Sequence, residues 1–455
     1  MQTAALPLAR APGPRGAPIF GSLFDAWRDP LKLLSEGARD HGNVVRFRFG
    51  SFQYVLVSGL NEIQHVLVKN QKNYIKSKSY QGVRLILGNG LLTSEGEFWR
   101  RQRRLAQPAF HVQRLRGLAA TMARLTGDTL ERWKAMPESR RTLDIHDEMY
   151  RLTFRIVGQT LCSSDVEGDA QAIGAALTVA VQYANDYVEQ LVRLPPWLPL
   201  PKNLRFRRAL GTLDSLVYRL IEEHRAASDH ESDLLGMLMS ATDDEGSGEG
   251  MTTQQLRDEV MTLVLAGFET TANALTWTLY LLAKHPEAAR RLEQEVAEVL
   301  GGRAATFEDL PRLELTERVL QESMRLYPPA WCFEREALEA DEVGGYAIPA
   351  KTTIAVCPYV LHRNPSYWQD AEKFDPDRFL PERGAARSRF AYLPFGDGPR
   401  ICIGKGFAMM EAKIVLAMIA GAFRLQLTSD QPVDVDPGIT LRPKHGVPMV
   451  LAPRA

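Results

Sequence analysis

The stretch Phe395-Gly-Asp-Gly-Pro-Arg-Ile-Cys-Ile-Gly-Lys-Gly406 governs the interpretation of the whole chain. Its glycines and its proline force a tight, irregular backbone on both sides of Cys402. The run 407–423 that follows is largely apolar and free of proline, which predicts a buried helix. Cys402 is therefore expected on a loop that leads into a helix N-terminus, where backbone amides and the helix dipole favour a thiolate over a thiol.

A cysteine in this setting has two explanations. A lone Cys-x-Gly is more often a buried structural cysteine than a ligand. Small residues on both sides, however, let a large flat group approach the backbone, as a haem-iron ligand requires. The full pattern Phe-Gly-x-Gly-x-Arg-x-Cys-x-Gly favours the second explanation and resembles the haem-binding loop of the cytochrome P450 family. The resemblance implies that Cys402 is the axial ligand of the haem iron, with Phe395, Arg400 and Gly404 in the haem-binding site.

The composition is that of an ordinary globular protein. The 455 residues are 45% hydrophobic and 24% charged, and Lys+Arg and Asp+Glu both number 55, so nothing suggests nucleic acid as a partner. The four cysteines lack Cys-x-x-Cys spacing, so neither a zinc site nor a redox dithiol is indicated. Four scattered cysteines in a chain of this length fit a reducing cytoplasm. Residues 1–20 contain no apolar core segment, so we expect a loose lead-in without signal peptide or transmembrane anchor.

A basic segment at residues 98–105 reads Phe-Trp-Arg-Arg-Gln-Arg-Arg-Leu. As a helix, it places Trp99 and Arg103 on one face. A solvated basic helix is the ordinary explanation. The resemblance implies instead that this pair binds a haem propionate, and an indole N–H and a guanidinium are both donors suited to a carboxylate. It assigns the same role to Arg400 and to Arg335, which lies in a predicted strand over 330–338.

The run 252–285 predicts the longest helix, about 50 Å at roughly 1.5 Å per residue. Its centre carries Ala266-Gly-Phe-Glu-Thr-Thr271, and buried polar groups of this kind need partners. A structural polar network is one explanation. The motif also resembles the oxygen-activation motif of P450 monooxygenases, which implies that Glu269 and Thr270 control proton delivery. Phe268 departs from the histidine or glycine that is common at its place in relatives.

Two charged residues, Glu322 and Arg325, share a face of a predicted helix over 316–326. A lone Glu-x-x-Arg is usually a surface pair worth less than ~1 kcal/mol. The resemblance implies a buried structural set instead, completed by Arg378 in the stretch Phe374-Asp-Pro-Asp-Arg-Phe379. We expect this set to support the fold on the cysteine side of the haem and to take no part in the chemistry.

The resemblance extends from about residue 12 to about residue 453 and implies a mainly α fold with small β-sheets. The haem is expected between the long central helix and the helix after Cys402. Residues 21–455 are expected to form a single haem-binding domain without a fused reductase. Locally, the sequence predicts a β-hairpin over 44–57, a short helix near 61–69 and a long loop over 74–92 with one short helix.

The resemblance implies a haem-thiolate monooxygenase of a soluble, bacterial, cytoplasmic and monomeric type. It would contain haem b (iron protoporphyrin IX) and insert one oxygen atom of O2 into a small apolar substrate, a terpenoid, carotenoid, steroid or fatty acid. Electrons from NAD(P)H would arrive through a separate ferredoxin or flavodoxin, for which Arg100, Arg101, Arg104 and Lys405 are docking candidates. The candidate pocket residues are Leu263, Ala266, Phe268, Ala330 and Trp331.

Other classes of function stay open at this point. A haem-thiolate isomerase or dehydratase, or a peroxide-using relative, needs no external electrons, but such relatives tend to lack the acid–alcohol pair that Glu269 and Thr270 supply here. A non-catalytic haem sensor or carrier is a further alternative.

Overall fold

The computed structural model describes residues 9–162, 170–189, 195–226, 233–243, 246 and 248–454. Two compact units make up the chain, and each draws on three separate segments. The first, here called the β-rich unit, comprises Met1–Ser79, Met324–Asp375 and Leu380–Cys402. The second, the helical unit, comprises Tyr80–Ser323, Pro376–Phe379 and Ile403–Ala455.

A five-stranded sheet forms the centre of the β-rich unit. Its strand order is β2 (Val44–Phe49), β3 (Phe52–Val57), β9 (Thr353–Val356), β6 (Phe333–Ala337) and β4 (Tyr74–Lys76). The predicted hairpin is confirmed, because β2 and β3 pair antiparallel with Val44 opposite Val57. Strand β9 then pairs parallel to β3 and antiparallel to β6.

The two faces of this sheet have separate hydrophobic cores. Successive side chains of a strand point to opposite faces. Accordingly, Val44 and Val57 belong to one buried cluster, whereas Val45 and Phe47 belong to another. Helices α2 (Pro30–His41) and α14 (Pro358–Leu361) contribute to the second cluster.

The remaining elements of the β-rich unit are short. Three strands form a second sheet in the order β1 (Ala9–Arg10), β8 (Tyr346–Ile348) and β7 (Asp341–Val343). The short helices and single turns are α1 (Leu23–Arg28), α3 (Leu60–Gln64), η1 (His65–Lys69), η2 (Gln71–Asn73), α15 (Pro381–Gly384), η7 (Arg389–Ala391) and η8 (Gly398–Arg400). The short helix predicted near 61–69 is therefore present as α3, which continues into the single π-helical turn η1.

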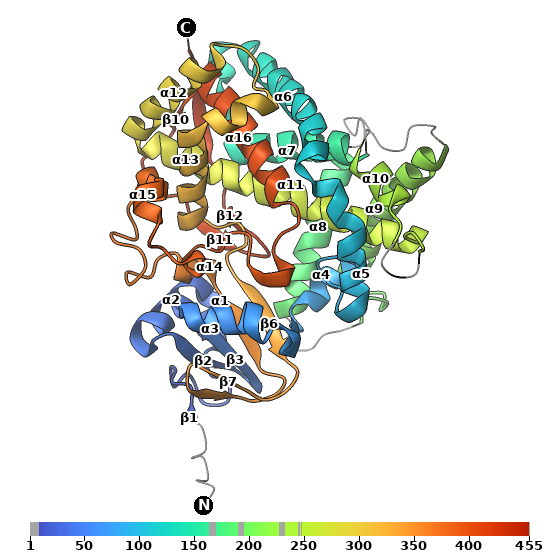
Figure 1. Cartoon of the computed structure of the whole chain (residues 1–455), viewed down its shortest axis with the longest axis vertical. Coiled ribbons are helices and arrows are strands. Elements are labelled where there is room, and N and C mark those ends of the chain that lie inside the picture. Colours follow the sequence, from blue (N-terminus) through green and yellow to red (C-terminus); the bar gives the residue numbers. More distant parts are fainter. Residues whose placement is uncertain are drawn as a thin grey trace, which may run out of the picture. The chain divides into compact units, whose positions relative to one another are not determined.

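Helix α11 (Thr253–Lys284) is the central element of the helical unit. It begins where predicted because Thr252 and Gln255 form a reciprocal capping box at its N-terminus. It packs against α7 (Ile145–Cys162) and α16 (Lys405–Ala422), which lie beside it in Figure 1. Apolar side chains cover most of its faces, so α11 is buried along much of its length.

The other helices of this unit surround α11. They are α4 (Tyr80–Leu87), α5 (Gly96–Ala106), α6 (Val112–Lys134), α8 (Ala170–Glu189), α9 (Pro201–Ala226), α10 (Leu234–Ser240) and α12 (Pro286–Leu300), with the turns η3 (Gln107–Phe110), η4 (Glu138–Arg140), η5 (Phe307–Arg312) and η6 (Pro376–Phe379). One small sheet has the order β10 (Phe423–Leu427), β13 (Pro448–Pro453) and β5 (Thr142–Asp144), and β11 (Val435–Pro437) pairs with β12 (Leu441–Pro443) as a hairpin.

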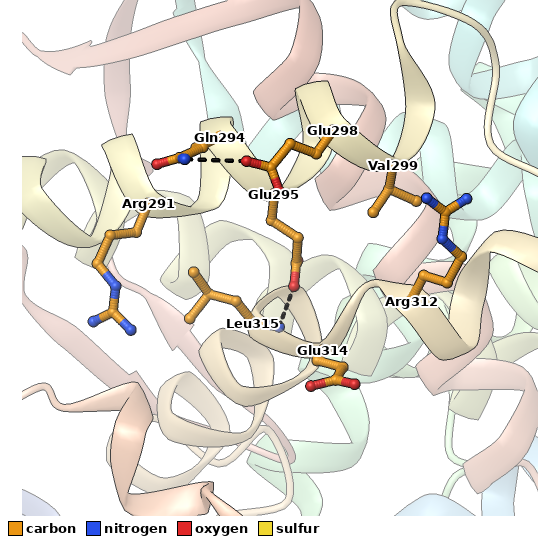
Figure 2. Close-up of a pocket in the computed structure, with 8 residues that line it drawn as sticks. All are labelled: Arg291, Gln294, Glu295, Glu298, Val299, Arg312, Glu314 and Leu315. Atoms are coloured by element: carbon orange, nitrogen blue, oxygen red, sulfur yellow. Dashed lines mark hydrogen bonds between the residues drawn. The ribbon is translucent and has the colours of Figure 1, made fainter.

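Helix α13 (Glu314–Leu326) runs from the helical unit into the β-rich unit. Its start is explained by Glu295 of α12, which accepts hydrogen bonds from Leu315 N at 2.5 Å and Thr316 N at 2.9 Å. Figure 2 shows the shallow hollow above this capped terminus, lined by Arg291, Gln294, Glu295, Glu298, Val299, Arg312, Glu314 and Leu315. Its charged lining suits a helix cap and not an apolar substrate.

The fold class predicted from the sequence, mainly α with small sheets, is confirmed. The short helix predicted within the loop over 74–92 is present as α4, whereas strand β4 was not predicted. Helix α4 buries Val83, Ile86 and Leu87, so tertiary burial stabilises a segment whose pattern gave no clean period. In the part of the chain that the structure describes, every helix is too short or too polar to cross a bilayer.

Candidate active site

Cys402 lies at the end of the glycine-rich loop in the β-rich unit, and its side chain is exposed. Its backbone N–H donates to Phe395 O at 3.0 Å, which closes the loop on itself. Helix α16 begins at Lys405, as expected for a cysteine that precedes a helix N-terminus. The thiol is thus presented by a closed loop and not buried as a packing residue.

Two glycines make this loop possible. Gly396 and Gly398 have φ values of 69° and 73°, a region that side chains with a Cβ rarely adopt. A Cβ on Gly398 would stand only 2.1 Å from Leu67 O. Asp397 ties the turn down by accepting from Gly398 N at 2.5 Å and by pairing with Arg389 at 3.3 Å.

The β-rich unit also holds the arginines predicted to bind propionates. Arg335 lies on β6 between β4 and β9, opposite Lys76 and Ile354. It is 8% exposed, and one guanidinium nitrogen donates to Glu334 O at 2.9 Å. Arg400 is half-buried in turn η8, two residues before Cys402.

Arg325 of α13 is completely buried in the β-rich unit. Its guanidinium donates to three backbone carbonyls, His362 O at 2.8 Å, Ala371 O at 2.6 Å and Lys373 O at 3.0 Å. It also lies 5.2 Å from the centre of the Trp368 ring. A buried charge requires such hydrogen bonding, so Arg325 holds together the backbone of residues 362–373.

His362 supports the segment that leads to the cysteine loop. Its Nε2 accepts from Leu393 N at 2.8 Å. Complete burial, followed by the charges of Arg325 and Arg363, lowers the pKa of His362 to about 3. The imidazole is therefore neutral at physiological pH, and this arrangement is structural.

In the helical unit, Trp99 and Arg103 lie on α5, which covers the predicted basic helix. They are four residues apart and so share one face. Trp99 is 9% exposed and Arg103 is half-buried. The indole N–H of Trp99 and the guanidinium of Arg103 therefore form a pair of donors on the same face of α5.

The three docking arginines on α5 have partners within the chain. Arg104 binds Asp243 at 2.9 Å, and Arg101 lies 3.3 Å from the same carboxylate. Arg101 also donates to Glu249 O and Gly250 O. Arg100 pairs with Glu97. These contacts join α5 to Asp243, Glu249 and Gly250 and leave less charge for an incoming partner than the sequence suggested.

Glu322 and Arg378 meet in the helical unit. Arg378 Nε donates to Glu322 Oε1 at 3.2 Å, and the two residues are 5% or less exposed. Helix α13 thus carries Glu322 in one unit and Arg325 in the other. The structure joins Glu322 to Arg378, while Arg325 binds backbone carbonyls.

One face of α11 is accessible where the rest of the helix is buried. Ala266 is exposed, and Leu263 and Thr270, three and four residues away, are half-buried. This spacing puts all three residues on one stripe of the helix. Thr270 Oγ1 donates to Ala266 O at 2.7 Å. Such back-bonding competes with the helix ladder and often bends the helix.

Glu269 points to a different part of the helical unit. It is 7% exposed, and its Oε1 accepts from Thr440 Oγ1 at 2.6 Å. Burial raises the pKa of Glu269, whereas the Thr440 hydrogen bond and the charge of Arg442 lower it. The carboxylate and the Thr270 hydroxyl are neighbours in the sequence, but they have separate hydrogen-bond partners.

Phe268 is not placed as expected for a pocket residue. It is fully buried between α7 and α11, with its ring 4.7 Å from Tyr150 and 5.5 Å from Phe154 in edge-on contacts. The prediction was wrong because Phe268 is two positions after Ala266, and two positions along a helix turn the side chain by about 200°, to the opposite side of α11. Of the remaining candidates, Ala330 is exposed and Trp331 half-buried in the β-rich unit.

Sequence reasoning missed three polar residues near Glu269. Thr440, Asn273 and His146 form a hydrogen-bonded series with it. Asn273 had a readable signal, because it lies four residues after Glu269 on a helix predicted to be buried. Thr440 and His146 had none, since their contacts with α11 join segments more than 120 residues apart.

The residues present fit a haem. A backbone cradle closed by left-handed glycines presents an exposed thiol, the soft ligand that haem iron accepts from a protein. Indole and guanidinium donors suit the propionates. In the helical unit, the accessible stripe on α11 is apolar apart from one hydroxyl, which suits contact with an apolar ligand. These features define a haem-thiolate protein.

Comparison with known proteins gives the family. A sequence model described as Cytochrome P450 matches residues 11–449. Cyclooctatin synthase from Streptomyces melanosporofaciens is 40% identical, with 100% of this chain and 97% of the relative covered. Cyclooctat-9-en-7-ol 5-monooxygenase from the same species is 36% identical over 98% of this chain and 96% of the relative. Pentalenene oxygenase from Streptomyces avermitilis is 34% identical over 92% of each chain.

The chain belongs to the cytochrome P450 family. It is a haem-thiolate monooxygenase, an oxidoreductase that uses O2 and electrons from redox partners, as predicted from the sequence. Two relatives are themselves named as a monooxygenase and an oxygenase, so the isomerase, peroxygenase and sensor alternatives lose their support.

Proposed function

We propose that this cytochrome P450 oxidises a cyclic terpenoid. The observation that carries the proposal is the accessible stripe of α11, where Leu263, Ala266 and Thr270 offer an apolar surface with a single hydroxyl. Such a surface suits a compact hydrocarbon skeleton and has no cation for a carboxylate. Two relatives support the same class by name, through cyclooctat-9-en-7-ol and pentalenene. Steroids, carotenoids and fatty acids are the competing classes.

We assign the following roles to the residues of the site. Bound haem would supply the oxidation chemistry, and the Cys402 thiolate would hold its iron. Trp99, Arg103, Arg335 and Arg400 would neutralise the propionates, and Phe395 and Gly404 would shape the loop around the sulfur. Glu269 and Thr270 would hold and move the protons that oxygen activation consumes. Glu322, Arg325 and Arg378 would maintain the fold.

Substrate-induced spectral shifts test the substrate class. The holoenzyme is titrated with cyclic terpenes, steroids, carotenoids and fatty acids of similar size. We expect the cyclic terpenes to give the largest shifts at the lowest concentrations. Stronger binding of fatty acids or steroids would contradict the terpenoid assignment without affecting the family.

The reduced carbon monoxide spectrum tests the ligand. A red-shifted band of the thiolate type is expected in the parent and should disappear in Cys402→Ala. Cys332→Ala is the matched control, because Cys332 is another cysteine of the β-rich unit that lies outside the loop. A band that survives in Cys402→Ala would overturn the assignment of Cys402.

We propose that a ferredoxin or flavodoxin, itself reduced by NAD(P)H, docks on basic residues that include Arg100 and Lys405. Both side chains are exposed. Charge steering raises association rates and is screened by salt. Arg100→Glu with Lys405→Glu should slow reduction by an acidic donor several-fold at low salt and less at high salt. Arg124→Glu, an exposed cation on α6, is the control; equal slowing in both would argue against a specific docking surface.

We also propose that residues 21–455 act as a single haem-binding domain, monomeric and cytoplasmic. The family match runs without interruption across both compact units, which supports a single domain. Cys332 and Cys357 are free thiols, which agrees with a reducing compartment. Sedimentation of the holoenzyme tests the monomer, and a concentration-dependent dimer would contradict it.

A further inference from the structure

A series of hydrogen bonds reaches the Glu269 carboxylate from two other parts of the helical unit. Thr440, in the loop between β11 and β12, donates to Glu269 Oε1 at 2.6 Å. Asn273 Nδ2 donates to Thr440 Oγ1 at 3.0 Å. His146 Nε2, at the start of α7, lies 3.1 Å from Asn273 Oδ1. Four side chains from three elements are therefore joined in one line.

The chemistry of these groups gives the line a direction. An amide nitrogen donates and an amide oxygen accepts. Because Thr440 accepts from Asn273, its single proton is directed at Glu269. Because Asn273 Oδ1 accepts, the proton between it and His146 must come from the imidazole. All three donors therefore point toward the carboxylate, and aligned hydrogen bonds polarise one another.

The loop that carries Thr440 is fixed to α11 at a second point. Trp277 Nε1 donates to Leu441 O at 3.0 Å. Glu269, Asn273 and Trp277 are spaced four residues apart, so they lie along one face of α11. Asn273 and Trp277 are fully buried. The position of the Thr440 hydroxyl is thus determined by the helix that carries its target.

We propose that Thr440 is a positioning residue for Glu269, whose carboxylate it holds on the hairpin side of α11 while Asn273 and His146 keep its hydroxyl aimed. The proposal rests on the proposed role of Glu269 in proton delivery. Thr270 belongs to the accessible stripe, about 100° around the helix from Glu269. The strength of the Thr440 bond therefore sets how readily the Glu269 side chain turns from the hairpin toward Thr270.

The charge of Arg442 and the Thr440 hydrogen bond both lower the pKa of Glu269. Arg442, held by Asp436 at 2.9 Å, favours the ionised form of Glu269 and opposes the effect of burial on its pKa. Burial and the Glu269 charge raise the pKa of Tyr150, so this neighbour stays neutral.

At the far end of the line, burial lowers the pKa of His146, with Arg442 acting in the same direction, while Asp144, Asp147 and the Asn273 bond raise it. At Glu269 burial is the largest effect and the pKa is raised overall, whereas the Thr440 hydrogen bond lowers it. Loss of this hydrogen bond should therefore raise the pKa of Glu269 further.

Infrared difference spectra of the substrate-free holoenzyme test the proposal directly. Subtraction of the Glu269→Gln spectrum from the parent spectrum across a pH series reports the titration of Glu269. Thr440→Val keeps the side-chain shape and removes the donor, so the midpoint should rise by about one to two pH units. Thr440→Ser should restore the parent midpoint. An unchanged midpoint in Thr440→Val would overturn the proposal.

Coupling of electron use to product separates this inference from the proposed function. We expect Thr440→Val to change the pH profile of coupling while substrate affinity stays within twofold of the parent. If Glu269→Gln kept full coupling, the proposed proton-delivery role would fail. The infrared titration would still decide whether Thr440 positions the carboxylate.

Discussion

The two faces of α11 around residues 263–273 differ in what surrounds them. On one face, Leu263, Ala266 and Thr270 are accessible or half-buried. On the other, Phe268 and Glu269 are packed against α7 and the C-terminal hairpin. The helix therefore divides a motif that is continuous in the sequence into an accessible part and a buried part. Substitutions that act on stability should fall on the second face, and substitutions that act on binding on the first.

Phe268→Ala should have the largest effect on stability. The side chain is completely buried between two aromatic rings, and removal of a buried phenylalanine costs about 3–5 kcal/mol. Urea denaturation of the parent and variant measures the change. Substrate-induced spectral shifts should survive in the protein that remains folded; their complete loss would place Phe268 on the ligand-facing side after all.

Glu259→Gln tests a second buried position of α11, nearer the N-terminus of the helix. Burial raises the pKa of Glu259 from 4.5 to about 7, although one oxygen accepts from Leu91 N at 3.0 Å. The folded state therefore binds this proton more tightly than the unfolded chain. The contribution to stability is complete below pH 4.5 and is lost as the pH rises through 7.

A glutamine at this position cannot ionise, so the variant should lose less stability than the parent between these pH values. We expect a relative gain of about 1–3 kcal/mol at pH 8. Denaturation curves at pH 4.5, 6 and 8 measure it. Gln255→Glu, a neutral-to-acidic change at the half-exposed N-terminus of the same helix, provides the contrast. If the free energy of unfolding changed with pH in the same way for Glu259→Gln and the parent, the pKa of Glu259 would not be raised in the folded protein.

Ala266→Phe should act on binding and leave stability nearly unchanged. Ala266 is exposed on the accessible stripe, so a larger side chain has room in the fold but occupies space intended for a ligand. We expect the apparent affinity for a terpene to fall about tenfold, close to 1.4 kcal/mol. The free energy of unfolding of the apoprotein should change by less than about 0.5 kcal/mol. Strong destabilisation instead would show that this face is packed.

Thr270→Ala should give the smallest change in stability of the four. The hydroxyl donates only to a carbonyl of its own helix, and this bond competes with the helix ladder. The free energy of unfolding should change by less than about 0.5 kcal/mol. Coupling of electron use to product should fall several-fold, with more peroxide released. Thr278 donates the same kind of hydrogen bond to Ala274 O from a buried position, so Thr278→Ala is the control and should leave coupling unchanged.

Local parts of the fold and site could be predicted from the sequence. The glycine loop before α16, the β2–β3 hairpin and the capped start of α11 depend on residues within a few positions of one another. Period-two and helical patterns, turn glycines and capping pairs record such local causes directly.

Long-range contacts could not be predicted in this way. Glu269 meets a hydroxyl 171 residues further along the chain, and no local pattern reports that distance. Arg325 finds three carbonyl acceptors through backbone geometry, which side-chain identity does not encode. The placement of Phe268 failed for a different reason, because neighbours in a motif were assumed to share a face.

The division of the chain into interleaved segments has a consequence for biosynthesis. The central sheet of the β-rich unit joins β2 and β3, from residues 44–57, to β9 and β6, from residues 333–356. During translation the β3 edge must therefore wait, unpaired, while the intervening residues emerge from the ribosome. An open strand edge invites pairing with other chains.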